Sequence, residues 1–553
     1  MKKTNIYLSC ALALSGFAFT GCLDLDQEPK SNIVTEEQKS EVIKNDPSMA
    51  AASVATIPSM VTAFMANGWG NVHVDFGYPS IMISTDTRGM DMPSNLGNYQ
   101  QYQPALELED FNGRYFLNLE FWYTFYNLIH SANSVLLNVE PTEPLTKYFC
   151  GQALAFRSWA YFNLAQMYQF TYAANPNALT VPILTEKNMT TAPAEGCPRA
   201  TAEQLYNQII GDLTTAIQYL HEADAEGYNR ESQAEAAIVK TFVNEAVCYG
   251  LRARANLFKT EYAAAAADAT EAIRLAEAEG ATPYTRDALI EPQFYNIADK
   301  AWLWGTYSDI SSSQFRGVVN YASFVTGWTV NGYAGAGFYR CVNKALYDRI
   351  PVDDIRKGWW ISGDGTIRPS LPAKYSSYIN NAEANGMAPF PAYAQLKIGA
   401  VDGDPATNSG AIDNPLMRIE ELFLIKAEGE GYTNVTTGTQ TLVNFVKAFR
   451  YPGYNFTAAS FQDLQNEIWF QRRVELWGEG FSYYDMMRLR KPLNRIGGGF
   501  TSSVVFNIEP TNTVLLYDIP QAEVQRNPQI GTNTNGSSIP SPVADDPNAS
   551  LVL

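Results

Sequence analysis

Cys22 is the residue whose chemistry the sequence indicates most directly. It follows the small pair Thr20-Gly21 and an apolar stretch from Tyr7 to Phe19, which has a basic start at Lys2-Lys3. Thirteen residues are too few to cross a ~30 Å hydrocarbon core as a helix, so the stretch is typical of a secretory signal. The sequence predicts cleavage before Cys22 and acylation of its thiol. An ordinary signal peptide with an incidental cysteine is the alternative.

Glu475 and Glu479 are the second candidates for chemistry. A spacing of four residues would place both carboxylates on one face of a helix, where a glycosidase could use them as acid and base. Their surroundings favour another role, because arginine beside a carboxylate keeps it ionised. The neighbouring arginines are Arg472, Arg473, Arg488 and Arg490. We therefore predict ion pairs between the last helices, and no catalytic residue.

The composition argues against several functional classes. The formal net charge is −18 and the isoelectric point is near 4.7, so a phosphate backbone would be repelled. The three histidines, His73, His130 and His221, are too few and too scattered for a histidine-rich metal site or a Ser-His-Asp arrangement. We predict no nucleic-acid partner and no cofactor.

The remaining cysteines do not form a metal-binding or disulfide framework. They are Cys150, Cys197, Cys248 and Cys341. No Cys-x-x-Cys spacing joins them, which favours isolated cysteines. The acidic turns Asp353-Asp354 and Asp402-Gly403-Asp404 offer oxygen ligands but lack the full spacing of a calcium site. We predict no metal site.

Helical periodicity covers much of the chain. Apolar residues recur at intervals of three and four in segments separated by proline and polar breaks. The predicted helices span residues 116–136, 147–172, 205–220, 236–258, 262–279, 417–429, 442–449 and 461–477. Thr201 is predicted to cap the third, and a shorter pattern over 36–67 is interrupted at Pro47 and Pro58. Helices of this kind pair as hairpins.

A tetratricopeptide-like repeat underlies part of this pattern. Small residues recur between residues 249 and 272, and an aromatic residue, Tyr262, begins the second helix of the pair. The predicted fold class is therefore mainly α, a tetratricopeptide-like helical scaffold with large irregular insertions and a few short β-hairpins. One hairpin is predicted at 359–367 and a short helix at 339–348.

The predicted domains follow from these elements. Residues 1–21 are a signal peptide, 22–34 a lipidated tether, and 35–553 a single body. Its helical scaffold covers about 35–67, 114–280 and 416–490. Two regions, 68–113 and 282–415, lack periodicity and are rich in Gly and aromatic residues. Loops of this length in a compact protein are usually functional.

The C-terminal stretch from Gln471 to Arg488 resembles the signature of the SusD/RagB family. The residues that fit the family pattern are Arg472, Glu475, Leu476, Glu479, Gly480, Asp485 and Arg488. The residues that depart from it are Gln471, Ser482, Met486 and Leu489. Further similar segments are 418–428, the helix containing Trp122, Tyr126, Ile129 and Asn133, and the strand 181–183.

The resemblance implies a SusD-like fold and a surface lipoprotein that takes up nutrients. It implies non-catalytic binding of a glycan and delivery to a SusC-type TonB-dependent outer-membrane transporter. The lipid on Cys22 would anchor the chain to the outer membrane, facing the cell exterior. Peptide uptake by the same architecture is the alternative, and a glycoside hydrolase is a second one.

The resemblance also suggests where a ligand would bind. In the family, aromatic platforms come from loops that correspond to residues 86–103 and 311–340 here. Flat rings stack on the apolar face of a sugar, and amides bond to its hydroxyls. The candidate ligand-binding residues are Asn95, Tyr99, Tyr102, Tyr321, Trp328, Tyr333 and Phe338.

Overall fold

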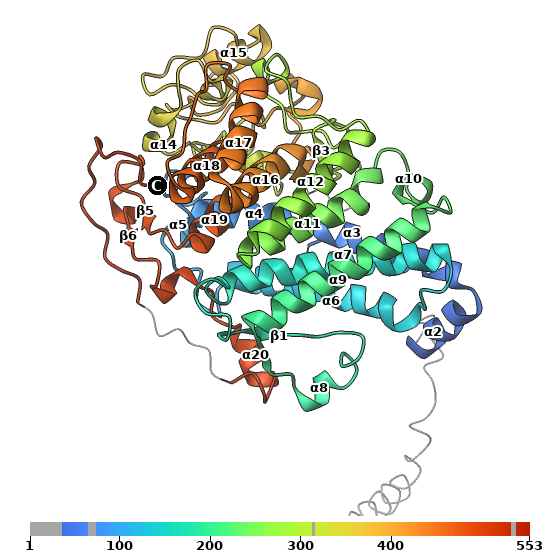
Figure 1. Ribbon diagram of the computed structural model, residues 1–553. Helices are drawn as coiled ribbons and strands as arrows, with labels where there is room; N and C mark the ends of the chain where they lie inside the picture. The colour runs from blue at the N-terminus through green and yellow to red at the C-terminus, as the bar shows by residue number, and fades with distance from the viewer. Residues whose placement is uncertain (1–35, 65–72, 312–315, 532–537) are drawn as a thin grey trace, which may run out of the picture. The chain divides into compact units, whose positions relative to one another are not determined.

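The computed structural model describes residues 36–64, 73–311, 316–531 and 538–553 (Figure 1). Cys22, the signal peptide and the tether lie outside these residues, so their predictions are not addressed by the structure. The chain divides into two compact units, Met1–Met49 and Ala50–Leu553. The first contains helix α2 (Glu36–Asn45). The second contains the helices and strands described below.

Eight helices of the second unit form the scaffold. They are α6 (Phe116–Asn138), α7 (Pro144–Met167), α9 (Ala202–Asp224), α11 (Glu245–Phe258), α12 (Tyr262–Ala278), α16 (Ile419–Thr433), α17 (Val435–Phe449) and α18 (Phe461–Glu475). Each of the first seven packs against the next along the chain, and α18 packs against both α16 and α17. Figure 1 shows α6, α7 and α9 side by side. The mainly α, helical-repeat prediction is confirmed.

Buried polar contacts fix how these helices pair. Arg157 of α7 donates to both carboxylate oxygens of Asp212 on α9 (2.7 Å each) and to the side-chain oxygen of Asn133 on α6 (2.8 Å). At the start of α9, the Thr201 hydroxyl accepts from the Gln204 N–H while the Gln204 side chain accepts from the Thr201 N–H. These two reciprocal hydrogen bonds between Thr201 and Gln204 form a capping box, which confirms the predicted cap at Thr201.

The predicted start of the fourth helix is wrong. The segment before α11 forms α10 (Arg230–Gln233) and a 3-10 turn (Val239–Thr241), and α11 begins only after Asn244. The Asn244 side chain accepts from the Val247 N–H at 3.0 Å, and this cap sets the boundary. Pro58 is likewise no break, because α3 (Ala51–Ser59) includes it.

The first irregular region contains a helix that the sequence pattern hides. Helix α4 (Tyr78–Arg88) is buried along its whole length. A helix enclosed on every side has no face that must be polar, so its polar and apolar residues follow no amphipathic period. The prediction that residues 68–113 lack a regular helix is therefore wrong. A further short helix, α5, covers Gln103–Leu106.

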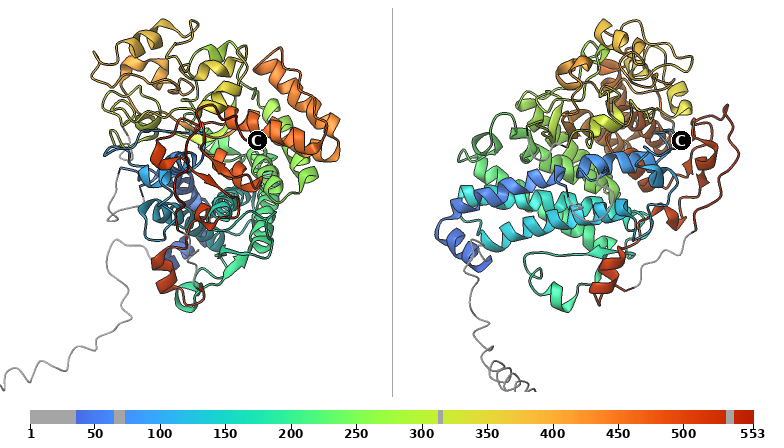
Figure 2. Two further views of the ribbon diagram at one scale, coloured as in Figure 1. Left: turned by 90° about the vertical axis from the view of Figure 1, so that its left-hand side faces the viewer. Right: turned by 180° about the vertical axis from the view of Figure 1, so that it is seen from behind.

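The middle region is held at its two ends by a small sheet. Strand β3 (Trp302–Thr306) pairs antiparallel with β4 (Asn414–Arg418). Between them lie three short helices, α13 (Tyr321–Val325), α14 (Lys344–Arg349) and α15 (Ala373–Asn380). Figure 2 shows this yellow region gathered beside the helical scaffold. The predicted helix over 339–348 begins five residues later, at Lys344, and ends at Arg349.

The predicted β-hairpin at 359–367 is absent from the described chain. Residues Ile355–Trp359 form a 3-10 helix, and a tight turn follows in which the Ser362 N–H donates to the Thr366 carbonyl at 3.1 Å. Trp360 instead pairs with the distant Gln395 in an isolated bridge. The long-range pairing therefore replaced the local one.

Short strands and helices complete the unit. Strand β1 (Leu179–Pro182) pairs with β2 (Arg199–Thr201), and β5 (Leu493–Asn494) with β6 (Asn507–Ile508), all antiparallel. The remaining helices are α8 (Ala192–Glu195), α19 (Ser482–Arg488) and α20 (Gln521–Arg526). The remaining 3-10 helices of this unit are Met60–Thr62, Ala288–Ile290, Val401–Gly403, Pro405–Thr407, Ser502–Val504 and Thr513–Leu515, and one more, Pro47–Ala50, spans the boundary between the two units.

Candidate ligand-binding surface

Tyr99 and Phe338 form the aromatic part of the candidate surface. Their ring centroids lie 6.3 Å apart and the ring planes are inclined by 61°. The Tyr99 side chain is 61% exposed and Phe338 is half-buried. Two rings from segments 239 residues apart thus meet at the surface. Such a pair offers flat apolar area with little conformational freedom to lose on binding.

Asn95 lies beside the aromatic pair. Its side chain is exposed, and the amide donates to the carbonyl oxygen of Gly337 at 3.1 Å. Gly97 brings the loop backbone directly against Phe338, since a Cβ on Gly97 would lie 2.9 Å from a Phe338 ring carbon. We call Asn95, Tyr99 and Phe338 the loop platform. It combines ring faces with an amide that can bond to a hydroxyl.

Backbone hydrogen bonds hold the two segments of the loop platform together. The Cys341 N–H donates to the Pro93 carbonyl at 3.0 Å, and the Asn343 N–H donates to the Asp91 carbonyl at 3.1 Å. The buried Arg340 guanidinium also donates to the Gln100 side-chain oxygen at 2.9 Å. The platform is therefore supported by a buried polar layer, although its residues lie in loops.

Tyr333 lies at the edge of the platform rather than on it. Its ring stacks on Phe324, with centroids 4.1 Å apart and planes 7° from parallel, and it is 7% exposed. The hydroxyl contacts the ring nitrogen Nδ1 of His73, which is exposed. Burial raises the pKa of the Tyr333 hydroxyl. A ligand on the platform could reach this hydroxyl and His73, but not the face of the ring.

Three predicted site residues are interior residues. Tyr102 is fully buried and exchanges a 2.8 Å hydrogen bond with Ser80, while the buried Tyr321 donates to the Gly478 carbonyl. Trp328 is 1% exposed, belongs to an apolar cluster of the middle region, and donates to the Ile398 carbonyl at 2.8 Å. These three rings have no free face, which corrects their assignment as ligand contacts.

Sequence reasoning missed His73 and Phe324 as parts of this surface. Phe324 is 1% exposed and supports Tyr333, whereas His73 reaches Tyr333 from a segment 260 residues earlier. Phe324 had the same aromatic, glycine-rich setting as the chosen residues. His73 carried no local signal, because only the tertiary contact with Tyr333 reveals it.

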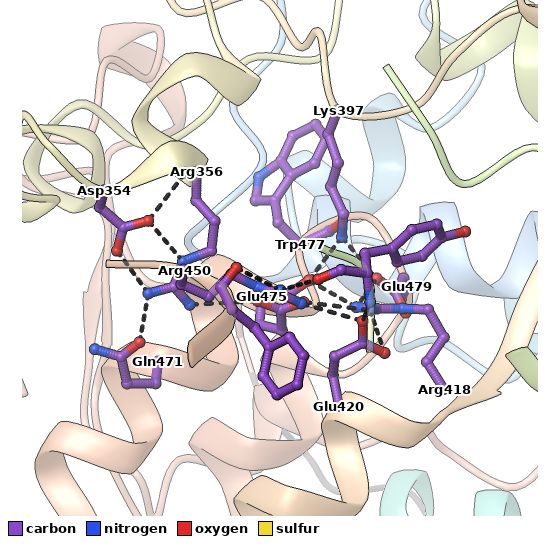
Figure 3. A network of polar contacts seen from close by, with 12 residues as sticks. Asp354, Arg356, Lys397, Arg418, Glu420, Arg450, Gln471, Glu475, Trp477 and Glu479 are labelled. Atoms are coloured by element: carbon purple, nitrogen blue, oxygen red, sulfur yellow. Dashed lines mark hydrogen bonds and ion pairs between the residues drawn. The ribbon is translucent and has the colours of Figure 1, made fainter. Parts of the chain in front are cut away.

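Glu475 and Glu479 lie in a buried ionic network (Figure 3). Glu475 accepts from Arg450 at 2.7 Å through each of its oxygens and from Arg418 at 3.2 Å. Glu479 accepts from Arg418 at 2.9 and 3.0 Å and from Lys397 at 2.6 Å. The predicted ion pairs are confirmed, but their partners come from other segments than the neighbouring arginines.

This network holds both carboxylates in the charged form. The surrounding cations lower the pKa of Glu475 and of Glu479 in spite of burial. Helix α18 ends at Glu475, so the two residues do not share a helix face as the spacing predicted. Both lie beneath the surface, where no substrate could reach them. The pair therefore acts as a structural junction.

Metal ligands and disulfides are not apparent in the described part of the chain. No group of three or more His, Cys, Asp or Glu side chains there is placed to hold a metal ion. Asp354 instead pairs with Arg356 at 2.7 Å. The cysteines Cys150, Cys197, Cys248 and Cys341 are all free thiols.

Two family models match separate parts of the chain. Residues 43–240 match a SusD-like model described as starch-binding associating with outer membrane. Residues 362–535 match the model of the SusD family. These matches fall on both the helical scaffold and the C-terminal signature.

The chain belongs to the SusD/RagB family.

Solved structures show the same fold. A SusD-like carbohydrate binding protein from Bacteroides vulgatus superposes with a TM-score of 0.67 at 22% identity, covering 87% of this chain and 96% of that one. A SusD superfamily protein from Bacteroides thetaiotaomicron superposes with a TM-score of 0.66 at 19% identity, covering 88% of this chain and 99% of that one. A SusD superfamily protein from Bacteroides vulgatus superposes with a TM-score of 0.67 at 17% identity, covering 89% of this chain and 98% of that one. No curated protein matches the chain significantly.

The SusD/RagB signature connects directly to the loop platform. Arg473 donates to both carboxylate oxygens of Asp91, the closest contact being 2.6 Å, and the Trp477 indole donates to the Asp91 carbonyl at 2.8 Å. Ser482, which departs from the family pattern, donates to the same carboxylate. Asp91 begins the segment that carries Asn95 and Tyr99. The signature thus positions the loop that carries two of the candidate residues.

No helix in the described residues is long and apolar enough to cross a membrane.

Proposed function

We propose that this SusD/RagB protein binds a glycan, without catalysis, on the loop platform. The observation that carries the proposal is the exposed Tyr99–Phe338 pair, with the Asn95 amide beside it. A pyranose ring has an apolar C–H face that stacks on an aromatic ring and hydroxyls that bond to amides. The matching family model is described as starch-binding, which agrees with this ligand class.

The proposal includes delivery to a membrane transporter. Acylation at Cys22 would tether the chain to the outer membrane, facing the exterior, and a SusC-type TonB-dependent transporter would receive the ligand. The supporting facts are the lipoprotein-like start of the sequence and the family description of association with the outer membrane. Co-purification of the full-length, lipidated chain with such a transporter from membranes tests this part.

The binding proposal is tested with the chain from residue 23 onward. Tyr99→Ala and Phe338→Ala should each weaken binding to any glycan detected on an array by about fivefold to tenfold. This corresponds to ~1 kcal/mol, the usual contribution of an aromatic contact. Isothermal titration calorimetry measures the change.

Tyr432→Ala is the matched control, because Tyr432 is 60% exposed and lies on α16 rather than on the platform. Its affinity for the glycan should equal that of the unmodified chain. Unchanged affinity in both platform variants would contradict the site. Binding of oligopeptides but no glycan on a parallel array would replace the proposed ligand by a peptide.

A further inference from the structure

A cleft of about 800 Å³ lies on the helical scaffold, away from the loop platform. Its lining residues come from the ends of α9 and α12, the start of α11, α10 and residues 298–303. Its lining includes none of Asn95, Tyr99 and Phe338. The volume falls within the ~300–1,000 Å³ typical of small-molecule sites.

The charged groups of this cleft compensate one another. The buried Arg230 donates to Glu231 at 2.9 Å and to Glu279 at 3.3 Å. The Asn244 amide also donates to both oxygens of Glu279 at 2.9 Å. The carboxylates are Asp224, Glu231, Glu245 and Glu279, and the cations are Arg230, Lys240 and Lys300. A nearly balanced lining does not favour a strongly charged ligand of either sign.

The same lining alternates hydrogen-bond donors and acceptors. The half-buried Lys240 uses one N–H on the Asp299 carbonyl at 2.7 Å, and an ammonium group has three. Asn229 and Glu231 also line the cleft; the Asn229 amide donates to Asp224 at 2.7 Å, and Glu231 has an exposed carboxylate. Sugar hydroxyls both donate and accept, so they can bond to each of these groups.

Two tyrosines give the cleft an aromatic rim and a polar floor. Tyr228 lines the opening and is 38% exposed, which leaves ring area free for stacking. Tyr148 lines the interior, is 1% exposed, and its hydroxyl has no hydrogen-bond partner among the described residues. A buried hydroxyl without a partner costs free energy, which a ligand hydroxyl would recover.

We propose that this cleft is a second binding site for a short, neutral oligosaccharide. One sugar ring stacks on Tyr228, its hydroxyls bond to the Lys240 ammonium and the Glu231 carboxylate, and a further hydroxyl reaches Tyr148. The ligand class rests on the proposed glycan-binding function, whereas the location rests on the cleft alone. Such a site would hold a second segment of a long chain or a released fragment.

The test uses Tyr99→Ala/Phe338→Ala as a background without the loop platform. Maltohexaose, cellohexaose, xylohexaose and mannohexaose are the neutral probes, titrated by calorimetry into the chain from residue 23 onward. At least one probe should still bind at millimolar concentration. Adding Tyr228→Ala should weaken this binding at least fivefold. Tyr148→Phe, which removes only the hydroxyl, should weaken it about threefold.

The controls separate this proposal from the platform. If the platform variants bind normally but Tyr228→Ala abolishes binding, the cleft proposal holds and the platform proposal fails. If no probe binds the background, or Tyr228→Ala has no effect there, the cleft proposal is overturned. Binding of tetra-alanine in place of every sugar would also overturn it. Tyr432→Ala should change none of these affinities.

Discussion

Buried carboxyl groups in this protein differ in whether cationic side chains lie beside them. Asp86 of α4 is buried, and its carboxylate accepts from the Gly480 N–H at 3.0 Å, while its other oxygen has no partner among the described residues. Burial raises the pKa of Asp86 from 3.8 to about 7. Glu475, at similar depth, is surrounded by arginines and its pKa falls. Partners, rather than depth, decide the charge state of a buried carboxyl.

Asp86 makes the stability of the protein depend on pH. The folded state holds this proton more tightly than the unfolded chain, so the contribution of Asp86 to stability is fully present below pH 3.8 and is lost as pH rises toward about 7. Asp86→Asn removes the charge and should raise the free energy of unfolding by ~1–3 kcal/mol at pH 8, and by clearly less at pH 5. Urea unfolding at several pH values measures the difference.

The matched control is Asp348→Asn, a surface carboxylate that pairs with Lys344 at 2.7 Å. Its effect on stability should be small and similar at pH 5 and pH 8, because exposed ion pairs contribute little. An Asp86→Asn difference that does not grow with pH would refute the assignment of a raised pKa to Asp86.

At the scale of elements, backbone hydrogen bonds between distant segments fix the loops that have no regular structure. The segment that carries Asn95 and Tyr99 is joined to the segment that carries Phe338 by backbone bonds at Pro93 and Asp91. Helix α4, which precedes it, is buried on all sides. Hydrogen-bonded contacts of high sequence separation thus hold the platform, and they carry no periodic signal in the sequence.

Gly97 controls the fit between these two segments. Its φ of 151° and the 2.9 Å approach of a Cβ to the Phe338 ring leave no room for a side chain. Gly97→Ala should displace the Tyr99 loop and weaken glycan binding at least threefold, with a small loss of stability of about 1 kcal/mol. Calorimetric titration and thermal unfolding measure the two effects.

Gly211→Ala is the control for this change. Gly211 lies in α9 and a Cβ there meets nothing within 4 Å, so alanine should leave binding unchanged and slightly stabilise the helix. Full glycan affinity in Gly97→Ala would show that the contact between Gly97 and Phe338 does not shape the platform.

Within the whole Ala50–Leu553 unit, a buried ionic network joins parts of the chain that are distant in sequence. Glu475 and Glu479 meet Arg418 at the end of β4, Arg450 after α17, and Lys397 of the middle region. The adjacent signature residue Arg473 extends this junction to Asp91. The scaffold, the middle region and the platform loop are therefore coupled through one motif.

Removing one charge from the centre of this network should destabilise the unit. Glu475→Gln removes the carboxylate that Arg450 and Arg418 share and leaves an excess of buried positive charge, which usually costs ~3–5 kcal/mol. Chemical unfolding followed by tryptophan fluorescence measures this loss in the free energy of unfolding. Glu271→Gln, which breaks the exposed pair with Arg274, should cost less than about 1 kcal/mol. Equal effects in the two variants would contradict a structural role for the network.

The sequence by itself determined the class of the protein. Periodicity predicted the scaffold helices, since a helix with one buried face must repeat its apolar residues. The residues from Gln471 to Arg488 indicated the family, and arginines beside Glu475 indicated ion pairs over catalysis. These are local features, which composition and spacing record.

Only the tertiary structure decided which of the candidate aromatic residues are exposed. Tyr99 and Trp328 lie in similar glycine-rich sequence, yet one is 61% exposed and the other 1%. The difference comes from distant partners: Trp328 bonds to Ile398, whereas Tyr99 meets Phe338 at the surface. Burial of a loop residue depends on which other segments cover it, and no local pattern encodes that.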